Sequence, residues 1–401
     1  MASTVIGRDE RQPLQRRDDA DLRWSVALDR TAQFLKADFQ KRFHGPWEPR
    51  CWRAPGRVNL IGEHTDYTQG LVLPIAVDLA CYTAWDRGGD TLDVFSENFG
   101  EGREWRIDEI GRVGPDGHWT DYVMGIAREL WLAGFEIPPG GLLIDSAVPL
   151  GSGLSSSAAL EVAVALALLD GREIPPLDLV RLCRRAENEF VGTPCGIMDQ
   201  YIAVFGQEGA AIRIDCRSLE SAAIALPAGI DIIVVNSMVK HELGRSAYRD
   251  RVRECHESEE KLGKPLRDAT LNEIQRLPKT LRRRARHVVT ENARVVAFGE
   301  ADSRRMGELF VESHHSLQHD YEVSCAELDF LVDRALELPG VLGARMTGGG
   351  FGGCTVNLVE EGHANEFTAS IANSYTAKFG VIPQIYPCKP VEGAGPLVPG
   401  H

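Results

Sequence analysis

The sequence predicts a two-domain α+β fold, and two observations lead to this prediction. First, a chain of 401 residues can hold two hydrophobic cores, and its 43% hydrophobic and 25% charged residues are typical of globular proteins. Second, strand-like and helix-like stretches intermix in both halves of the chain, which favours α+β layers. No linker rich in Pro, Gly or Ser marks a boundary, and we place it near residue 190, between domains of residues 1–190 and 191–401. The extreme C-terminus could pack back on the N-terminal domain.

The spacing of apolar residues predicts the individual elements. Residues 1–30 are polar and predict a partly frayed end, whereas residues 25–43 have helical spacing. Short apolar runs that alternate with turn residues predict β-structure over residues 51–83. Further helices are expected at residues 121–133, 155–170, 177–190, 246–261 and 281–298, and strands at residues 230–236 and 355–359. The basic run in the last of these helices is expected to form one solvated face, made of Arg282, Arg283, Arg284 and Arg286.

Composition narrows the classes of partner. The net charge of −14, from 44 basic and 58 acidic residues, argues against a nucleic-acid partner, which normally needs a basic face. Nine cysteines without a Cys-x-x-Cys pair suit reduced thiols in a cytosol and give no zinc template. The most apolar helical stretch, residues 158–169, is short and carries Glu161, so it predicts a buried helix and no membrane span. We therefore expect a cytoplasmic protein, a monomer, with neither nucleic acid nor membrane as partner.

The most informative stretch is residues 148–159, which read Val-Pro-Leu-Gly-Ser-Gly-Leu-Ser-Ser-Ser-Ala-Ala. An apolar run precedes it and a helical run follows, and a strand, a glycine-rich turn and a helix in this order make a cradle for anions. The loop is not of the Walker type, because the chain's Gly-Lys pair is followed by Pro265, and Ser156 stands where a dinucleotide fingerprint needs its third glycine. The simpler alternative is a serine-capped helix after a turn. The sequence thus favours a phosphate-binding loop.

A second unusual stretch, residues 53–67, packs polar side chains around two glycines and next to apolar positions. Neighbouring carboxylates and an imidazole can exchange hydrogen bonds with several hydroxyl groups at once, as a sugar requires. The alternative is a solvated turn with a salt bridge from Arg57.

Four segments in the expected order resemble the GHMP kinase superfamily and, within it, the galactokinase family. Residues 56–67 are similar to the galactokinase signature, 149–158 to the superfamily's phosphate loop, 195–200 to its catalytic segment and 345–354 to its third motif. The resemblance extends from about Asp29 to the C-terminus. It implies a two-domain GHMP kinase fold with the active site in the interdomain cleft, and a third motif that shapes the cleft beside the phosphate loop.

The activity implied by this resemblance is transfer of the γ-phosphoryl group of ATP to the C1 hydroxyl of α-D-galactose. The products would be galactose 1-phosphate and ADP, in the first committed step of galactose metabolism, the Leloir pathway. One alternative is a kinase for N-acetylgalactosamine or L-arabinose, because Thr68 stands where many galactokinases carry Asn. Another is a non-catalytic galactose sensor, against which the whole serine-rich loop and Asp199 argue.

The resemblance also implies catalytic roles for two residues. Asp199 would be the general base that accepts the proton of the anomeric hydroxyl. An ordinary Asp, with a pKa of about 3.9, is a weak base, which phosphoryl transfer through a loose transition state tolerates. Arg57 would lie beside Asp199 and stabilise developing charge. The structural alternative for Asp199 is a carboxylate that caps a helix.

The remaining roles follow from the resemblance in the same way. Mg²⁺ would bind Ser157 and Glu187, because it prefers hard oxygen ligands and keeps several waters; Glu189 is a rival to Glu187, and only one of them should face the metal. The sugar-contacting set would be Glu63, His64, Thr65, Asp66, Gly196 and Tyr248, although Tyr248 could be a packing residue. The nucleotide-contacting set would be Ser96, Trp119, Gly151, Ser152, Gly153, Leu154, Ser155, Ser156 and Ser157, although Trp119 could belong to the core.

Overall fold

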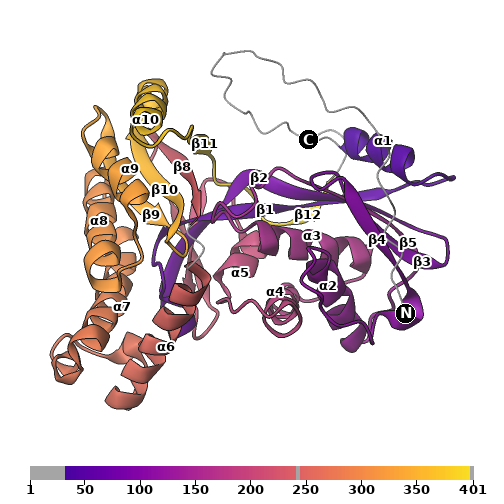
Figure 1. The fold of residues 1–401 in the computed structure, drawn as a ribbon, viewed down its shortest axis with the longest axis horizontal. Helices are drawn as coiled ribbons and strands as arrows, with labels where there is room; N and C mark the ends of the chain where they lie inside the picture. Colours follow the sequence, from indigo (N-terminus) through magenta and orange to yellow (C-terminus); the bar gives the residue numbers. More distant parts are fainter. Residues whose placement is uncertain (1–31, 241–243, 398–401) are drawn as a thin grey trace.

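The computed structural model describes residues 32–240 and 244–397 and shows mixed α and β structure built around two sheets (Figure 1). The predicted frayed end at residues 1–30 and the start of the first predicted helix lie outside the described residues. The large sheet has the strand order β12-β1-β2-β5-β3-β4, and β6 and β7 extend it from β2. The small sheet has the order β11-β8-β10-β9.

The strands of the large sheet are β1 (Arg50–Ile61), β2 (Leu71–Arg87), β3 (Thr91–Ser96), β4 (Glu101–Arg106), β5 (Gly140–Ser146), β6 (Ala210–Asp215), β7 (Ser221–Ala225) and β12 (Gly395–Pro396). Those of the small sheet are β8 (Ile230–Lys240), β9 (Val341–Thr347), β10 (Gly352–Glu360) and β11 (Gln384–Cys388).

Helices cover both sheets, as Figure 1 shows. One group lies against a face of the large sheet: α2 (Asp121–Leu132), α3 (Ser156–Leu169), α4 (Pro176–Arg185) and α5 (Met198–Phe205). A second group lies at the end of the molecule that carries the small sheet: α6 (Gly244–Leu262), α7 (Lys279–Phe298), α8 (Ser303–Ser316), α9 (Ala326–Leu336) and α10 (Ala364–Phe379). The short helix α1 (Ala32–Arg42) lies on the other face of the large sheet. The largest buried cluster is shared by the large sheet, its helices and one face of the small sheet, and a smaller cluster lies between the small sheet and helices α9 and α10.

Most of the predicted elements are confirmed with shifts of a few residues, among them α2, α3, α7 and β8. The predicted helix at residues 177–190 is α4 followed by a π-helical turn, η3 (Ala186–Val191). The prediction of a solvated basic face on α7 is wrong for Arg284. This side chain is 2% exposed and pairs with Glu254 and Glu322 at 2.8 and 2.7 Å, because a buried guanidinium needs carboxylate partners.

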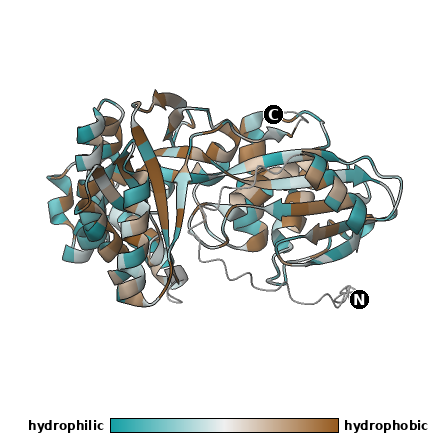
Figure 2. Cartoon of the chain, turned by 90° about the horizontal axis from the view of Figure 1, so that it is seen from above, coloured by the Kyte–Doolittle hydropathy of each residue, from teal (hydrophilic) through white to brown (hydrophobic). Residues whose placement is uncertain are grey.

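Helix α3 is the central support of the large sheet. Ten of its 14 residues are buried, many of them alanines, and it packs on β1, β2, α2 and α5. A helix that is apolar on all sides needs such surroundings, and alanine lets the neighbours come close. In Figure 2 hydrophobic residues gather along the strands, where the core lies. No helix in the described ranges is both long and apolar enough to cross a membrane.

The last strand of the described residues returns to the large sheet. The C-terminal strand β12 pairs antiparallel with β1, with Trp52 opposite Pro396 and Arg53 opposite Gly395. Just before it, Val77 of β2 forms an isolated bridge with Pro390. The chain thus leaves the small sheet through β11 and adds its last strand to the edge of the large one.

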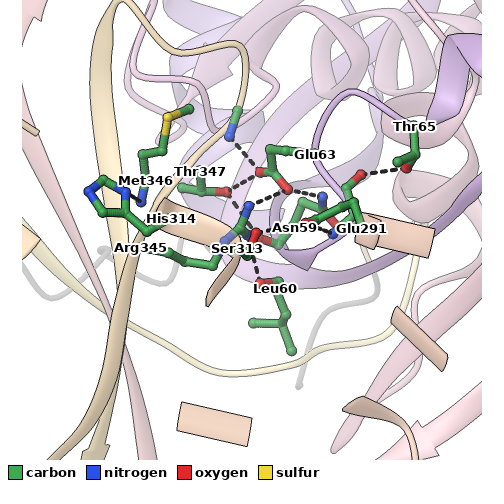
Figure 3. Close-up of polar contacts among 12 residues, drawn as sticks. Asn59, Leu60, Glu63, Thr65, Glu291, Ser313, His314, Arg345, Met346 and Thr347 are labelled. Atoms are coloured by element: carbon green, nitrogen blue, oxygen red, sulfur yellow. Dashed lines mark hydrogen bonds and ion pairs between the residues drawn. The ribbon is translucent and has the colours of Figure 1, made fainter. Parts of the chain in front are cut away.

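A buried ion pair joins the two sheets (Figure 3). Glu63, directly after β1, contacts Nη2 of Arg345 on β9 at 2.9 Å, and the side chains are 2% and 0% exposed. Arg345 also donates to the carbonyl oxygens of Leu60, at 2.7 Å, and Asn59, at 3.2 Å. Glu63 accepts further hydrogen bonds from Asn59, the Thr347 hydroxyl and the Gly348 N–H. Both charges of the pair are therefore compensated by protein groups.

A second carboxylate braces the same corner. Glu291 of α7 accepts hydrogen bonds from the Gly62 N–H at 2.9 Å and from the Ser313 hydroxyl at 2.7 Å, and pairs with Arg294 at 2.6 Å. Burial alone would raise the pKa of Glu291, but Arg294, His287 and Arg345 together lower it to about 2. The loop after β1 is thus held from both β9 and α7 (Figure 3).

We predict that Arg345→Met lowers the free energy of unfolding by about 3–5 kcal/mol, because it leaves Glu63 buried without a cation. The control is Arg305→Met, which removes an exposed arginine paired with Glu308 and Glu312 and should cost less than about 1 kcal/mol. Chemical unfolding followed by circular dichroism measures both variants. Equal losses in the two variants would contradict the role of the buried pair.

Candidate active site

The centre of the candidate site is a carboxylate held by a guanidinium. Asp199 lies in the first turn of α5, and Arg57 reaches it from β1. Arg57 Nε donates to Oδ1 at 2.8 Å and Nη2 to Oδ2 at 2.7 Å, so the pair is bidentate. Arg57 is 6% exposed, and β1 shifts its register between Pro55 and Arg57, which turns the side chain out of the regular pleat.

The glycine-rich loop touches this pair directly. Ser155 directly before α3 has left-handed backbone torsions, and its hydroxyl donates to Asp199 Oδ2. It makes no cap bond to the helix, so the simple alternative of a serine-capped helix is not what the structure shows. Arg57 also donates to the Gly153 carbonyl, and the Leu154 carbonyl accepts from the Arg57 N–H at 3.0 Å. A Cβ on Gly56 would stand 2.7 Å from that carbonyl, so glycine is needed there.

The second glycine-rich segment packs against the first. Gly348 lies beside Gly153, and a Cβ on Gly353 would come within 3.3 Å of the Ser152 carbonyl, which also accepts the Cys354 thiol at 2.8 Å. The third motif therefore lies along the phosphate loop and sets its shape.

A hydroxyl and a carboxylate lie next to each other at the start of α3. The Ser157 hydroxyl lies near Glu187, which is in the π-helical turn η3 and is 4% exposed. Burial is the main cause that raises the pKa of the Glu187 carboxyl group above its usual value. Glu189 instead lines the neighbouring cavity. One hydroxyl and one carboxylate suit Mg²⁺, which keeps several waters and takes further oxygens from phosphates.

A cavity of about 810 Å³ has a lining that includes Asp66, Gly196 and Tyr248, and the charge of Asp199 acts on Asp66. A Cβ on Gly196 would collide with the Asp66 carboxylate, so the glycine makes room for it. The ring of Tyr248 lies 5.5 Å from that of His64, whose Nε2 is buried and has no hydrogen-bond partner within the described chain. Four of the six residues expected at the sugar thus gather here.

The other two expected sugar residues face the protein. Glu63 gives its oxygens to the inter-sheet cluster described above. The Thr65 hydroxyl is fully buried and contacts the carbonyl oxygens of Gly62 at 2.8 Å and Leu71 at 2.7 Å. Both side chains fix the loop that carries His64 and Asp66, and their direct contact with a sugar stays a prediction.

Burial gives the two titratable groups of this loop opposite tendencies. It raises the pKa of Asp66 to about 6, helped by the nearby charge of Asp199. It lowers the pKa of His64 to about 3, helped by His287, so the imidazole is neutral at physiological pH. The His64 Nδ1 lies 2.9 Å from the Tyr67 hydroxyl, which in turn lies 2.7 Å from that of Tyr321.

The two residues expected near adenine belong to the part of the chain around β3 and β4, at one edge of the large sheet. Ser96 ends β3 and is 1% exposed. Trp119 stacks on Phe99, with ring centroids 5.2 Å apart, and its N–H donates to Glu101 at 3.1 Å. Their contact with a nucleotide also stays a prediction.

Sequence reasoning missed several residues of the cavity wall. Arg181, Arg184 and Arg185 of α4 line it together with Arg217 and His256. The three arginines follow the i, i+3, i+4 spacing of one helix face, which is a signal the sequence offered. The contact between Ser155 and Asp199 had no such signal, since 44 residues separate the two.

Comparisons with known proteins identify the family of this chain. The chain matches the galactokinase galactose-binding signature over residues 37–87, the GHMP kinase N-terminal domain over residues 121–207 and the GHMP kinase C-terminal domain over residues 295–377. It is 45% identical to a galactokinase of Chloroflexus aggregans over 372 residues, which are 88% of this chain and 95% of that protein. It is 43% identical to a galactokinase of Thermotoga maritima over 338 residues, 82% and 95% of the two chains.

A solved structure points the same way. The crystal structure of Lactococcus lactis galactokinase complexed with galactose superposes with a TM-score of 0.85 at 34% identity and covers 90% of this chain and 99% of that one. The signature, the two kinase domains and the near full-length relatives lead to one conclusion: this chain belongs to the galactokinase family of the GHMP kinases.

Proposed function

We propose that this ATP-dependent sugar kinase phosphorylates the C1 hydroxyl of α-D-galactose, with Asp199 as the general base. The observation that carries the proposal is the bidentate pair of Asp199 and Arg57, which contacts the glycine-rich loop and interacts electrostatically with Asp66 of the cavity wall. In the reaction the sugar oxygen O1 forms a bond to Pγ, and the bond from Pγ to the β,γ-bridging oxygen of ATP breaks. The proton of O1 passes to the Asp199 carboxylate.

The arrangement suits this chemistry for electrostatic reasons. Phosphoryl transfer passes through a loose transition state, so positioning and charge neutralisation matter more than early deprotonation. The Arg57 guanidinium cannot lose its proton, and the Gly153 carbonyl and Asp199 together fix its orientation. Charge that develops on the transferred group would meet this fixed cation.

The phosphates of ATP would lie along residues 149–157, where α3 begins and its first N–H groups are free to donate. Ser157 and Glu187 would hold Mg²⁺, and the close approach of the two side chains supports Glu187 over Glu189. When bound, the cation neutralises charge on the β and γ phosphates. Ser96 and Trp119 remain the proposed contacts of the nucleoside.

The sugar would lie against Asp66, Gly196, Tyr248 and the unpartnered Nε2 of His64. The ionised carboxylate accepts hydrogen bonds from hydroxyl groups, and the neutral imidazole adds one polar atom. The expected location in a cytosol is supported by the nine cysteines, none of which forms a disulfide. A monomer is likewise our expectation.

The substrate assignment is tested with a coupled ADP-release assay over galactose, its epimers, N-acetylgalactosamine and L-arabinose. We expect the highest kcat/KM for galactose, because galactokinases are the near relatives over almost the whole chain. A higher kcat/KM for any other sugar of the panel would overturn the assignment.

We predict that Asp199→Asn lowers kcat by about 10²–10⁴-fold, the range typical of a lost general base. Galactose binding, measured by titration calorimetry, should persist, because the amide keeps the shape of the side chain. The matched control is Asp38→Asn on α1, a surface carboxylate paired with Lys41 on the other face of the large sheet, which should leave kcat unchanged. A kcat within a few-fold of wild type in Asp199→Asn would remove Asp199 from the role of base.

We predict that kcat/KM for galactose falls as the pH drops below about 6, because Asp66 then takes up a proton and loses an acceptor. In Asp66→Asn this acid limb should disappear, while kcat/KM is low at every pH. His64 cannot cause the limb, since its pKa is about 3.

Stability provides the control for this prediction. The pKa of Asp66 is higher in the folded than in the unfolded chain, so its contribution to stability is present at low pH and is lost as the pH rises through about 6. Asp66→Asn should therefore melt no lower than wild type at pH 7. An acid limb near pH 6 that survives in the variant would show that another group causes it.

A further inference from the structure

Glu161 is a buried carboxyl group behind the candidate metal site. It lies on α3, one turn after Ser157 and on the same face, and it is 0% exposed. Its Oε2 accepts a hydrogen bond from Gln200 Nε2 at 3.0 Å, and no ion pair to it exists within the described ranges. A carboxylate in such surroundings would be an uncompensated buried charge, which proteins avoid.

Two buried oxygens in this place lack a hydrogen-bond donor. They are Oε1 of Glu161 and Oε1 of Gln200, and the other ends of the same two groups are already bonded to each other. A neutral carboxylic acid resolves this, because its O–H can donate to the amide oxygen while the amide N–H donates to the acid's other oxygen. One proton on Glu161 thus satisfies both atoms.

The amide of Gln200 continues to the metal side. Its Nε2 also donates to Glu187 Oε2 at 2.7 Å, and the Cys195 thiol donates to the same oxygen at 3.2 Å. The opposite orientation of the amide would turn its oxygen towards two carboxyl groups. Glu161 therefore fixes the orientation of the Gln200 amide, and in this orientation the amide donates a hydrogen bond to Glu187.

We propose that Glu161, as a neutral acid, and Gln200 are positioning residues that orient Glu187 towards Ser157 and the cation. This inference rests on the proposed roles of Ser157 and Glu187. The O–H of Glu161 donates to Gln200 Oε1, and the two N–H groups of Gln200 donate to Glu161 Oε2 and Glu187 Oε2. Neither residue touches the substrate or the reacting atoms.

The electrostatics of the site agree with a neutral Glu161. Burial, and next the charge of Glu187, raise its pKa well above the usual value. The nearby carboxylates of Glu187 and Asp199 then remain as the two charges that the cation and Arg57 meet. A third buried charge would add repulsion without a partner.

Glu161→Gln is the decisive variant, because glutamine reproduces the same pairing with Gln200 and carries no charge. We expect its kcat, its KM for galactose and its affinity for Mn²⁺ in the presence of ADP, measured by electron paramagnetic resonance, to stay within about twofold of wild type. In wild type, infrared spectroscopy should show a C=O stretching band of a protonated carboxylic acid that is absent from Glu161→Gln. A missing band in wild type, or a large loss in Glu161→Gln, would overturn the proposal.

Glu161→Leu and Gln200→Leu each interrupt the series of hydrogen bonds that runs from Glu161 through Gln200 to Glu187. Loss of a partner that orients a metal ligand typically costs about 10–100-fold in metal affinity, so we expect Mn²⁺ affinity in the presence of ADP to fall by about tenfold or more in each. The double variant should lose no more Mn²⁺ affinity than either single variant, because Glu161 acts on Glu187 only through Gln200. Galactose affinity should be unchanged, since neither side chain reaches the sugar cavity.

Unchanged Mn²⁺ affinity in the folded leucine variants would also overturn the proposal. If these variants do not fold, the infrared band and Glu161→Gln decide alone. An enzyme that prefers another sugar would contradict the proposed substrate and leave these metal measurements intact.

Discussion

The buried ion pair of Glu63 and Arg345 is the constraint on which the rest of the structure depends. It joins the loop after β1 to β9, and so the large sheet to the small one, with both charges removed from water. Such a pair stabilises only one geometry, because a small displacement would leave two unpaired charges. Glu291 and Arg294 hold the same loop from α7. His64 and Asp66 lie on this loop, so the contacts of Glu63 and Glu291 also fix their positions.

In the candidate active site, several backbone segments come close together around one arginine. Gly56 lets β1 come near the phosphate loop, and the second glycine-rich segment lies against the first. Arg57 then reaches the Gly153 carbonyl and Asp199 at the same time. Because the glycine-rich loop, Asp199 and Arg57 are in mutual contact, a displacement of any one of them would move the others.

Carboxyl groups with different surroundings take different tasks in this small volume. Asp199 is paired with Arg57, whereas Asp66 has its pKa raised to about 6 by burial and by Asp199. Glu187 meets donors from Gln200 and Cys195, and Glu161 lies deepest. Because the pKa of Asp66 is raised in the folded chain, its ionisation at neutral pH lowers the free energy of unfolding. A contact of this carboxylate with a sugar would explain why the residue is present. The buried carboxylate thus lowers the stability of the fold and provides hydrogen-bond acceptors in the site.

Local pattern and residue type were enough to predict the features that depend on neighbouring residues. Helical spacing predicted α2, α3 and α7, and the order of strand, glycines and helix predicted the phosphate loop, because these follow from neighbouring residues. The polar stretch around Arg57 indicated a sugar, and the family resemblance of residues 195–200 indicated a base at Asp199. Only the tertiary structure decided that Arg284 is buried, that Glu187 rather than Glu189 meets Ser157, and that Glu63 pairs with Arg345. Glu63 follows β1 of the large sheet and Arg345 lies on β9 of the small one. Hundreds of residues separate them, and no periodicity along the chain predicts a contact that packing alone creates.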